Sequence, residues 1–372
     1  MTKKRLVLYG GSFDPIHNGH LRLANAVSRL YDAVVLFVPN RMPPWKDPTT
    51  KPIERLSMIR LAFRENENTR LNFSNYELES KEERNYTIDT VKYYYQEYKD
   101  KADLYLLIGA DEANVFDKWK DPNEIARLAK ILVVPRPGME IDPGLKERFK
   151  MEIVPFTESG EVSSSAIREG KSMDYPSFVR RYMEGHHLYF FKKIHSKLSQ
   201  HRYAHVVSVA ETAYEIARAN NLDCADKIFW AGLLHDLAKE LDDETSRKMI
   251  EEEYPEYLDM PEWTYHQFLG AKLAKEEFGI EDEEILSAIA CHATGKGNMT
   301  QTDMILYASD KIEPNRGYDS SGYIASCKAN YLEGFKIVLQ ANMDFYHEQG
   351  YTFTDNRLTI EAVKQYLGEE SK

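Results

Sequence analysis

The spacing of apolar residues changes halfway along this chain of 372 residues, and that change constrains the fold more than any other feature. Up to about residue 190, short apolar runs alternate with stretches of helical periodicity. The expected strands are Leu6–Tyr9, Ala33–Val38, Asn72–Ser74, Leu104–Ile108, Ile131–Val134 and Ile153–Pro155. The expected helices between them are Leu21–Leu30, Pro52–Arg64, Tyr86–Tyr98 and Asn123–Lys130. This alternation predicts βαβ units, and therefore an α/β domain with a doubly wound parallel sheet covered by helices on both faces.

Beyond about residue 192 the strand pattern stops and only helical periodicity remains. The expected helices are Tyr203–Asn220, Asp226–Glu240, Glu244–Glu253, Tyr265–Phe278, Asp282–His292, Asp303–Ile312 and Cys327–His347. This second half is typical of an all-α bundle. The chain is also too long for one ordinary core. We expect two domains, residues 1–190 and 191–372, which join near residues 189–193.

The net charge of −12 is spread unevenly over these halves. Residues 1–190 carry 29 Lys and Arg against 28 Asp and Glu, whereas residues 191–372 carry 19 against 32. Such asymmetry favours two separately evolved units and argues against nucleic acid as a ligand of the acidic half.

The sequence offers no sign of a membrane protein or of export. No apolar run approaches the roughly 18–20 residues that a membrane-spanning helix requires. The basic start MTKKR leads into a short apolar run and then glycines, so it indicates a first strand rather than a signal peptide. We expect a cytoplasmic protein. Its three cysteines (Cys224, Cys291 and Cys327) lack paired or CxxC spacing, which predicts buried thiols.

The string GGSFDPIHNGH directly follows the first expected strand. Gly10 and Gly11 have no Cβ, so the backbone can turn there and approach a phosphate. The helix that begins at the end of the string directs its free N–H groups towards the same place. His17 and His20 can donate hydrogen bonds to phosphate oxygens, and we expect little burial at this turn. A glycine-rich turn with two incidental histidines is the competing interpretation, but the complete string is more specific.

The complete string resembles the HxGH signature of the nucleotidyltransferase superfamily. Further strings narrow the resemblance, over about residues 4–190, to bacterial nicotinate-mononucleotide adenylyltransferases. These strings are Tyr86-Thr87-Ile88-Asp89-Thr90, Gly109-Ala110-Asp111 with Phe116 and Trp119, Pro135-Arg136-Pro137-Gly138, and Val162-Ser163-Ser164-Ser165-Ala166-Ile167-Arg168. Two positions depart from the family pattern: Ser165 replaces the usual threonine, and Trp45 stands where a histidine is common.

The resemblance implies a Rossmann-like nucleotidyltransferase and a reaction. The phosphate of nicotinate mononucleotide attacks the α-phosphorus of ATP, which gives deamido-NAD and pyrophosphate, and Mg²⁺ accompanies the ATP. The implied catalytic residues are His17, His20 and Arg168, which stabilise the charge that develops on the phosphates.

The resemblance also implies a set of substrate-binding residues. They are Gly10, Gly11, Ser12, Phe13, Lys46, Thr87, Gly109, Asp111, Trp119, Arg136 and Ser164. In this interpretation Ser164 holds the leaving pyrophosphate. The backbone at Gly109 and Asp111 recognises the adenosine, while Thr87 and Trp119 hold the pyridine nucleotide.

A second group of polar residues lies in the acidic half. It comprises His205, His235, Asp236, His266, His292 and Asp310. Each lies within or at the end of an amphipathic helix, where an unpaired polar group facing the interior is costly. Metal coordination removes that cost, and helical bundles build such sites from facing helices. Four imidazoles and two carboxylates can supply a two-metal centre, with Asp236 as the bridge.

The order H…HD…H…H…D resembles the HD-domain phosphohydrolases over about residues 195–350. The strings HDLAK and ASDKIEPNR are most similar to the subfamily that hydrolyses diadenosine tetraphosphate symmetrically to two ADP. The resemblance implies that all six residues are metal ligands, that Asp236 is also catalytic, and that Lys239 contacts substrate. Glu313 and Arg316 are candidates for similar supporting contacts, and His201 competes with His205 as a ligand.

The implied cofactor of the second half is a pair of divalent metals, with iron indicated by the resemblance. The implied partners are ATP, nicotinate mononucleotide and a dinucleoside polyphosphate, without nucleic acid or membrane, and a homo-oligomer stays open. Two alternatives for the second half also stay open. One is a nucleotidase that acts on nucleoside mono- or diphosphates, and the other is a non-catalytic module that senses nucleotides.

Overall fold

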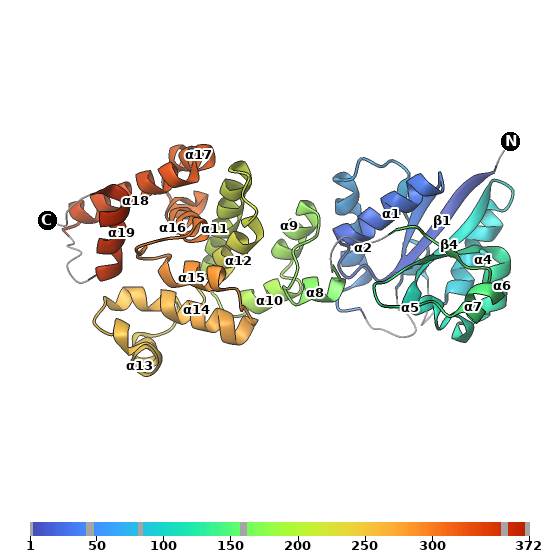
Figure 1. The fold of residues 1–372 in the computed structure, drawn as a ribbon, viewed down its shortest axis with the longest axis horizontal. Helices are drawn as coiled ribbons and strands as arrows, with labels where there is room; N and C mark the ends of the chain where they lie inside the picture. The colour runs from blue at the N-terminus through green and yellow to red at the C-terminus, as the bar shows by residue number, and fades with distance from the viewer. Residues whose placement is uncertain (1–2, 42–47, 81–84, 157–161, 351–355, 369–372) are drawn as a thin grey trace. The chain divides into compact units, whose positions relative to one another are not determined.

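The computed structural model describes residues 3–41, 48–80, 85–156, 162–350 and 356–368 (Figure 1). The chain divides into two compact units, Met1–Phe190 and Phe191–Lys372. The first unit holds a sheet with helices around it, and the regular elements in the described residues of the second unit are all helices.

Six parallel strands form the sheet of the first unit. They are β1 (Lys4–Gly11), β2 (Val34–Pro39), β3 (Leu71–Phe73), β4 (Ala102–Gly109), β5 (Lys130–Val134) and β6 (Glu152–Ile153). Their order, β3-β2-β1-β4-β5-β6, confirms the expected doubly wound sheet. The direction of winding reverses between β1 and β4, and ligands of such sheets bind in the crevice beyond the carboxyl ends of the strands at this reversal.

Helices cover both faces of this sheet. The helices of the first unit are α1 (Asn18–Leu30), α2 (Pro52–Arg64), α3 (Tyr76–Glu79), α4 (Thr87–Tyr98), α5 (Ala110–Ala113), the 3-10 helix η1 (Phe116–Lys118), α6 (Pro122–Leu128), α7 (Pro143–Arg148), α8 (Ser164–Arg168) and α9 (Ser177–Gly185). The next helix, α10 (Phe190–His195), begins at the boundary between the units. In Figure 1, α1 and α2 lie on one side of β1 and β4, and α4 and α6 lie on the other. The expected helices match α1, α2, α4 and α6 to within a few residues. Several of the remaining helices are too short for a periodic pattern to predict them.

The second unit is the expected all-α bundle. Its elements are α11 (Gln200–Ala219), α12 (Ala225–Leu234), α13 (Asp243–Glu253), η2 (Pro255–Tyr257), η3 (Glu262–Thr264), α14 (Tyr265–Phe278), α15 (Glu283–Cys291), α16 (Gln301–Ile312), η4 (Pro314–Arg316), α17 (Ser321–Ala329), α18 (Tyr331–Glu348) and α19 (Arg357–Leu367). The helix expected over Asp226–Glu240 ends at Leu234, so the His-Asp pair follows it directly.

The single helix expected over Cys327–His347 is wrong, because two helices, α17 and α18, meet at Asn330. This residue has an extended backbone (φ −158°), and its side-chain oxygen accepts hydrogen bonds from the N–H groups of Leu332 and Glu333, which caps α18. A Cβ on Gly334 would lie 2.4 Å from Cys327 Cα, so the two helices pack with their backbones close together. Capping and close packing therefore end one helix and begin the next.

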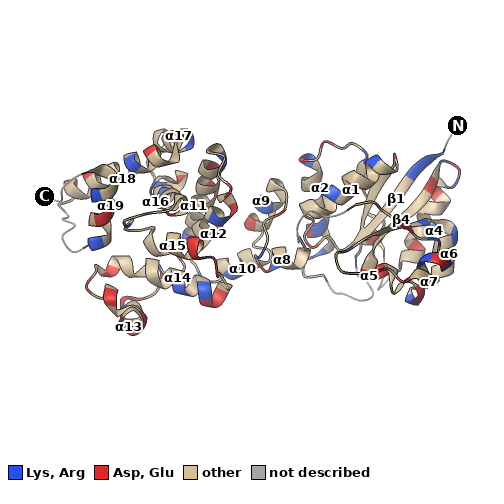
Figure 2. Ribbon diagram, in the orientation of Figure 1, with Lys and Arg blue, Asp and Glu red and all other residues tan. Residues whose placement is uncertain are grey.

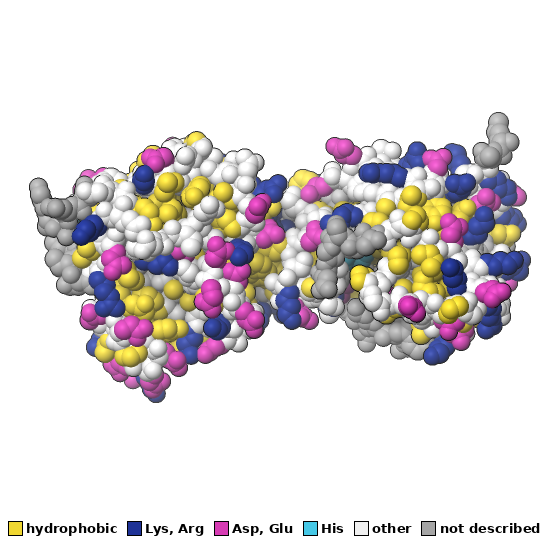
Figure 3. Space-filling view, in the orientation of Figure 1, with side chains coloured by type: hydrophobic (Ala, Val, Ile, Leu, Met, Phe, Trp, Pro, Cys, Tyr) yellow, Lys and Arg dark blue, Asp and Glu magenta, His cyan; other side chains and the backbone are white. Residues whose placement is uncertain are grey.

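Basic and acidic residues both occur along the helices of each unit (Figure 2). Hydrophobic side chains lie between the charged ones on the face shown in Figure 3. Among the described residues, none of the helices has the length and apolar character that spanning a bilayer demands.

Candidate active sites

A small cavity of about 90 Å³ lies at the carboxyl ends of β1 and β4. The predicted substrate-binding residues that line it are Gly10, Gly11, Thr87 and Trp119. A Cβ on Gly10 would meet no atom within 4 Å, so open space lies beside this residue. A Cβ on Gly109 would lie 2.5 Å from Asp111 Oδ1, so a side chain there would displace that carboxylate. The glycines therefore keep both strand ends free of side chains.

The two histidines of the HxGH string lie at the start of α1. The backbone N–H of His17 donates to His20 Nδ1 at 3.2 Å. The two rings stack, with 3.6 Å between their centroids. Because His20 Nδ1 accepts a hydrogen bond, the proton of a neutral His20 ring is on Nε2. His17 Nδ1 is buried, and no described group hydrogen-bonds to it.

The expectation of little burial at this turn is wrong. His17 is only 6% exposed. Val162 packs against Gly19, which has no side chain. A Cβ on Gly19 would lie 2.6 Å from the Val162 side chain, so glycine is needed for this contact. Burial lowers the pKa of His17 to about 4, and burial together with His17 holds the pKa of His20 well below its usual value. Both rings are therefore neutral at pH 7 in the free protein.

The residues predicted to hold pyrophosphate contact the histidine turn. Arg168 Nη1 donates to the Asp14 carbonyl oxygen at 2.7 Å. Ser164 Oγ donates to the Pro15 carbonyl oxygen at 2.9 Å. Both residues belong to α8, 149 or more positions further along the chain, so this short helix fixes the turn from the other end of the unit.

Other predicted substrate residues have supporting positions. The Phe13 side chain is buried, and its ring packs 5.0 Å from that of His20. The Ser12 carbonyl oxygen accepts from Arg55 at 2.8 Å, and no sequence motif indicated this buried arginine. Lys46 lies outside the described residues.

Asp111 and Arg136 form an ion pair beside the end of β4. Arg136 Nη1 lies 3.1 Å from Asp111 Oδ2. Both side chains are about half exposed, so solvent screens the pair and its contribution to stability is small. The pair instead fixes two charged groups next to Gly109.

The predicted metal ligands of the second unit converge. Asp236 Oδ2 lies 3.7 Å from His205 Nε2 and 3.6 Å from His235 Nε2. Asp236 Oδ1 lies 3.5 Å from both His266 Nε2 and His292 Nε2. The two oxygens of one carboxylate therefore face two separate pairs of imidazoles.

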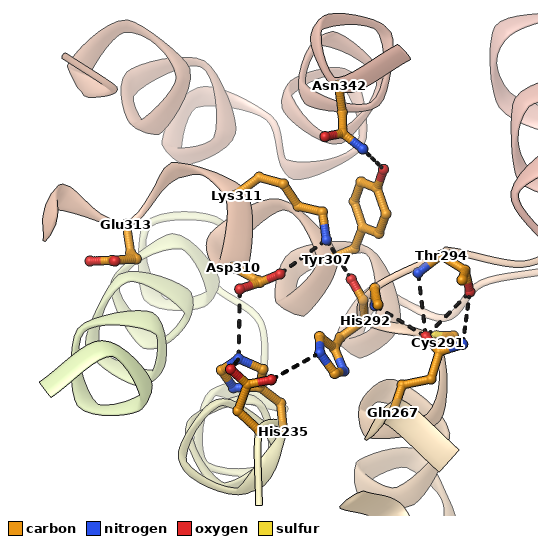
Figure 4. Close-up of polar contacts among 12 residues, drawn as sticks. His235, Gln267, Cys291, His292, Thr294, Tyr307, Asp310, Lys311, Glu313 and Asn342 are labelled. Atoms are coloured by element: carbon orange, nitrogen blue, oxygen red, sulfur yellow. Dashed lines mark hydrogen bonds and ion pairs between the residues drawn. The ribbon is translucent and has the colours of Figure 1, made fainter. Parts of the chain in front are cut away.

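The remaining predicted ligand, Asp310, lies on the side of the first pair. Its Oδ1 atom is 3.2 Å from His205 Nε2. The same atom is 3.6 Å from His235 Nε2, the contact drawn in Figure 4. Of the two competing histidines in α11, His205 is buried within this group, whereas His201 is exposed.

A hydrogen bond at Nδ1 orients each of the four imidazoles. His235, His266 and His292 each bond to the carbonyl oxygen three residues earlier, at 2.7 to 2.8 Å. His205 Nδ1 bonds to Glu313 Oε1 at 3.1 Å. These bonds occupy Nδ1, so the Nε2 atom of each ring faces the carboxylates and is the atom that would bind a metal, as in metal-binding histidines.

This donor set fits divalent metal ions. His205 Nε2 and His235 Nε2 are buried without a hydrogen-bond partner among the described residues. Two groups of ligand atoms, each within 4.8 Å of one another, share Asp236. Burial alone raises the pKa of Asp236, but the facing His235, His292 and His266 outweigh it and hold this pKa well below its usual value. An anionic bridge surrounded by imidazoles suits two cations.

Two further contacts fix the segments that carry these ligands (Figure 4). Gln267 Oε1 accepts from the backbone N–H groups of the two residues after His292, at 3.2 and 3.3 Å. Lys311 Nζ donates to the His292 carbonyl oxygen at 2.7 Å and to Asp310 Oδ2 at 3.0 Å. Sequence reasoning missed Gln267 and Lys311, although each directly follows a predicted ligand.

Cationic side chains surround the ligand cluster in a cavity of about 720 Å³. They are Arg202, Lys239, Lys311 and Arg316. Arg202 Nη1 lies 2.7 Å from Asp236 Oδ2. Its position one turn before His205 on α11 is the signal that could have found it. These cations suit an anionic ligand such as a phosphate chain.

Close packing of α11 on α12 brings His205 and His235 together, and Gly232 permits it. A Cβ on Gly232 would lie 2.6 Å from Ala210 Cα. We expect Gly232→Ala to lower the free energy of unfolding of the second unit by about 1–3 kcal/mol, because the helices must separate. We also expect it to weaken metal binding, because the Gly232 carbonyl orients His235. Urea unfolding of the metal-free protein and metal analysis check both effects.

Gly322→Ala in α17 is the matched control, because a Cβ there meets nothing within 4 Å. This variant should keep the wild-type stability or exceed it, since alanine favours a helix over glycine. An unchanged unfolding midpoint for Gly232→Ala would show that the crossing of α11 and α12 tolerates a methyl group.

Known proteins match both units. The cytidylyltransferase-like family matches residues 8–170, and the HD domain family matches residues 202–315. The chain is 28% identical to the "Probable nicotinate-nucleotide adenylyltransferase/Ap4A hydrolase" of Mycoplasma genitalium (strain G37), over 91% of this chain and 97% of that protein.

Two shorter relatives align with part of the chain. The "Nicotinate-nucleotide adenylyltransferase" of Bacillus subtilis (strain 168) is 36% identical over 50% of this chain and 98% of its own length. The "Probable nicotinate-nucleotide adenylyltransferase" of Aquifex aeolicus (strain VF5) is 40% identical over 38% of this chain and 85% of its own length. The chain therefore belongs to the nicotinate-nucleotide adenylyltransferase family and carries an HD domain as well, which confirms both resemblances drawn from the sequence.

Proposed function

We propose that the first unit transfers the adenylyl group of ATP to nicotinate mononucleotide, with release of pyrophosphate, and that Mg²⁺ accompanies the ATP. The observation that carries this proposal is the position of the histidine turn. It directly follows β1 at the reversal of the sheet, beside a cavity that Thr87 and Trp119 also line. The names of the relatives from B. subtilis and A. aeolicus support the same reaction.

Neutral histidines suit this chemistry. His20 Nε2–H has no acceptor among the described residues and can donate to a phosphate oxygen, and the backbone bond from His17 fixes that orientation. The N-terminal end of α1 adds free N–H groups and a positive dipole. Arg168 has five N–H donors. Two of them are used: Nη1 donates to the Asp14 carbonyl oxygen and Nη2 donates to Ser165 Oγ. The remaining donors are available to the leaving pyrophosphate. Catalysis of this kind depends on fixed donors rather than on a covalent intermediate.

We expect the first unit to prefer nicotinate mononucleotide over its amide analogue. Thr87 is the first residue of α4, so free backbone N–H groups lie beside the cavity and can donate to a carboxylate. The NH₂ group of the amide analogue would instead point its own N–H donors at these backbone N–H groups. Because hydrogen bonds to a charged group are stronger, we expect kcat/KM to differ by about 10- to 100-fold. Pyrophosphate release with each mononucleotide measures the ratio, and equal values would contradict the proposed recognition.

For the second unit we propose hydrolysis of diadenosine tetraphosphate to two ADP. The observation that carries it is the convergence of four imidazoles and two carboxylates inside a cationic cavity. His205, His235, Asp236 and Asp310 would hold one metal, and His266, His292 and Asp236 the other. When bound, two divalent metals, which we propose to be iron, lower the pKa of a coordinated water and polarise the phosphate oxygens. Lys239 and the other cavity cations bind the phosphate chain.

Product analysis of the full-length, metal-loaded chain tests this activity. Diadenosine tetraphosphate should yield ADP alone, because symmetrical cleavage divides the four phosphates equally. AMP with ATP would show asymmetrical cleavage. Release of inorganic phosphate from nucleoside mono- or diphosphates alone would show a nucleotidase, and an absence of hydrolysis would favour a binding module.

A further inference from the structure

The cavity of the second unit is lined by aromatic side chains as well as by the four cationic ones. Its lining includes Trp263, Tyr318, Tyr323, Phe345 and Tyr346. Trp263, Tyr318 and Phe345 are 43%, 48% and 56% exposed, so much of each of these residues is accessible to a ligand. The metal ligands and the four cations already account for the binding of a phosphate chain. They do not explain why aromatic rings line the same cavity.

One group of rings lies beside the second pair of imidazoles. The Trp263 carbonyl oxygen accepts the hydrogen bond from His266 Nδ1 at 2.8 Å, so the tryptophan directly adjoins that ligand. The rings of Trp263 and Tyr346 lie nearly parallel, with 26° between their planes and 6.4 Å between their centroids. They come from η3 and α18, and both line the cavity.

The other group of rings lies beside Asp310, on the side of the first pair of imidazoles. Tyr318 Oη donates to the Lys311 carbonyl oxygen at 2.6 Å, so its ring is held next to the ligand-bearing end of α16. Tyr323 lines the cavity with it. Arg316 lines the same cavity and contacts Asp310, because its Nε donates to the Asp310 carbonyl oxygen at 2.6 Å.

We propose that these rings form two nucleobase-stacking subsites, one on each side of the metal ligands. Trp263 and Tyr346 define one subsite, and Tyr318 and Tyr323 define the other. The ligand is then a nucleotide with a base at each end and a phosphate chain between, so the ligand cluster meets the middle of the chain. This inference rests on the proposed hydrolysis of a dinucleoside polyphosphate and explains why cleavage should be symmetrical.

Chemistry favours a base over other flat groups at these positions. Aromatic rings stack on every nucleobase, and the neighbouring cations require a ligand that also carries negative charge. A nucleoside at the end of a phosphate chain meets both demands. A substrate with one nucleoside would fill one subsite, and inorganic tetraphosphate would fill neither.

The test compares three substrates in the full-length, metal-loaded protein: diadenosine tetraphosphate, adenosine tetraphosphate and inorganic tetraphosphate. For Trp263→Leu and for Tyr318→Leu, we expect KM for the dinucleoside to rise about 10- to 100-fold, the loss typical of one stacked base. We expect kcat/KM for inorganic tetraphosphate to stay at the wild-type value. Trp263→Phe and Tyr318→Phe keep a ring and should recover most of the affinity.

Ile337→Ala is the matched control, because Ile337 is 47% exposed on the same helix as Tyr346 but does not line the cavity. An equal loss on all three substrates, or no loss on the dinucleoside, would overturn the two subsites while leaving the proposed hydrolysis in place. A wild-type chain that does not cleave the dinucleoside would overturn the hydrolysis instead. In that case, calorimetry with ADP tests the subsites separately. The subsites require that Trp263→Leu bind ADP more weakly than Trp263→Phe does, and equal affinities would overturn them.

Discussion

Asp236→Ala should abolish metal binding and hydrolysis in the second unit and leave adenylyl transfer in the first unit intact. Asp236 is 3% exposed, and its two oxygens face all four imidazoles at 3.5 to 3.7 Å. Without this carboxylate, two groups of ligands lose the member that they share. Removal of a residue that only hydrogen-bonds to a metal ligand already costs about 10- to 100-fold in metal affinity or activity. Loss of a ligand that both metals share should therefore cost more.

Three measurements on the same preparation check this result: metal content, ADP release from diadenosine tetraphosphate, and pyrophosphate release from ATP with nicotinate mononucleotide. Circular dichroism verifies that the bundle still folds, because the variant leaves Arg202 without its partner carboxylate. Asp259→Ala is the control, since Asp259 is an exposed carboxylate of the same unit. If Asp236→Ala kept both metals and full hydrolysis, the ligand cluster would not be the hydrolytic centre.

His17→Ala and His20→Ala should each reduce adenylyl transfer by about 10²- to 10³-fold, the usual cost of losing one preorganised donor to a developing charge. Burial keeps both rings neutral, with the pKa of His17 at about 4, so the loss should be similar across pH 6–8. Hydrolysis by the second unit should remain at the wild-type rate. Steady-state pyrophosphate release at several pH values measures the effect.

The burial of this turn makes a folding control necessary. His20 Nδ1 accepts from the backbone N–H of His17, the N-cap residue of α1, so His20→Ala also removes a helix-capping contact that is worth roughly 0.5–2 kcal/mol. Thermal unfolding separates that loss from the catalytic one. His186→Ala is the matched control, because this exposed histidine of the same unit belongs to no motif. Near-normal turnover in either HxGH variant would show that these rings do not stabilise the reacting phosphates.

Local pattern was enough to predict the elements that carry the chemistry. The strands follow from short continuous apolar runs and the longer helices from a hydrophobic period of 3.6 residues, and both signals depend only on neighbouring residues. The end of β1 at Gly10 and Gly11, and the start of α1 close behind it, were predictable for the same reason. At Asn330, where a side-chain cap ends one helix and begins the next, prediction from periodicity was wrong.

By itself, then, the sequence determined the two kinds of domain and the order of the motifs along them. Only the tertiary structure decided which atoms of those motifs face one another. Glu313 orients His205 across 108 residues, and α8 reaches back to the histidine turn across 149 or more. Such contacts depend on how helices cross, as the backbone approach at Gly232 illustrates, and local periodicity carries no information about crossing. Burial likewise depends on the packed neighbours, which is why local pattern did not predict the buried, neutral ring of His17.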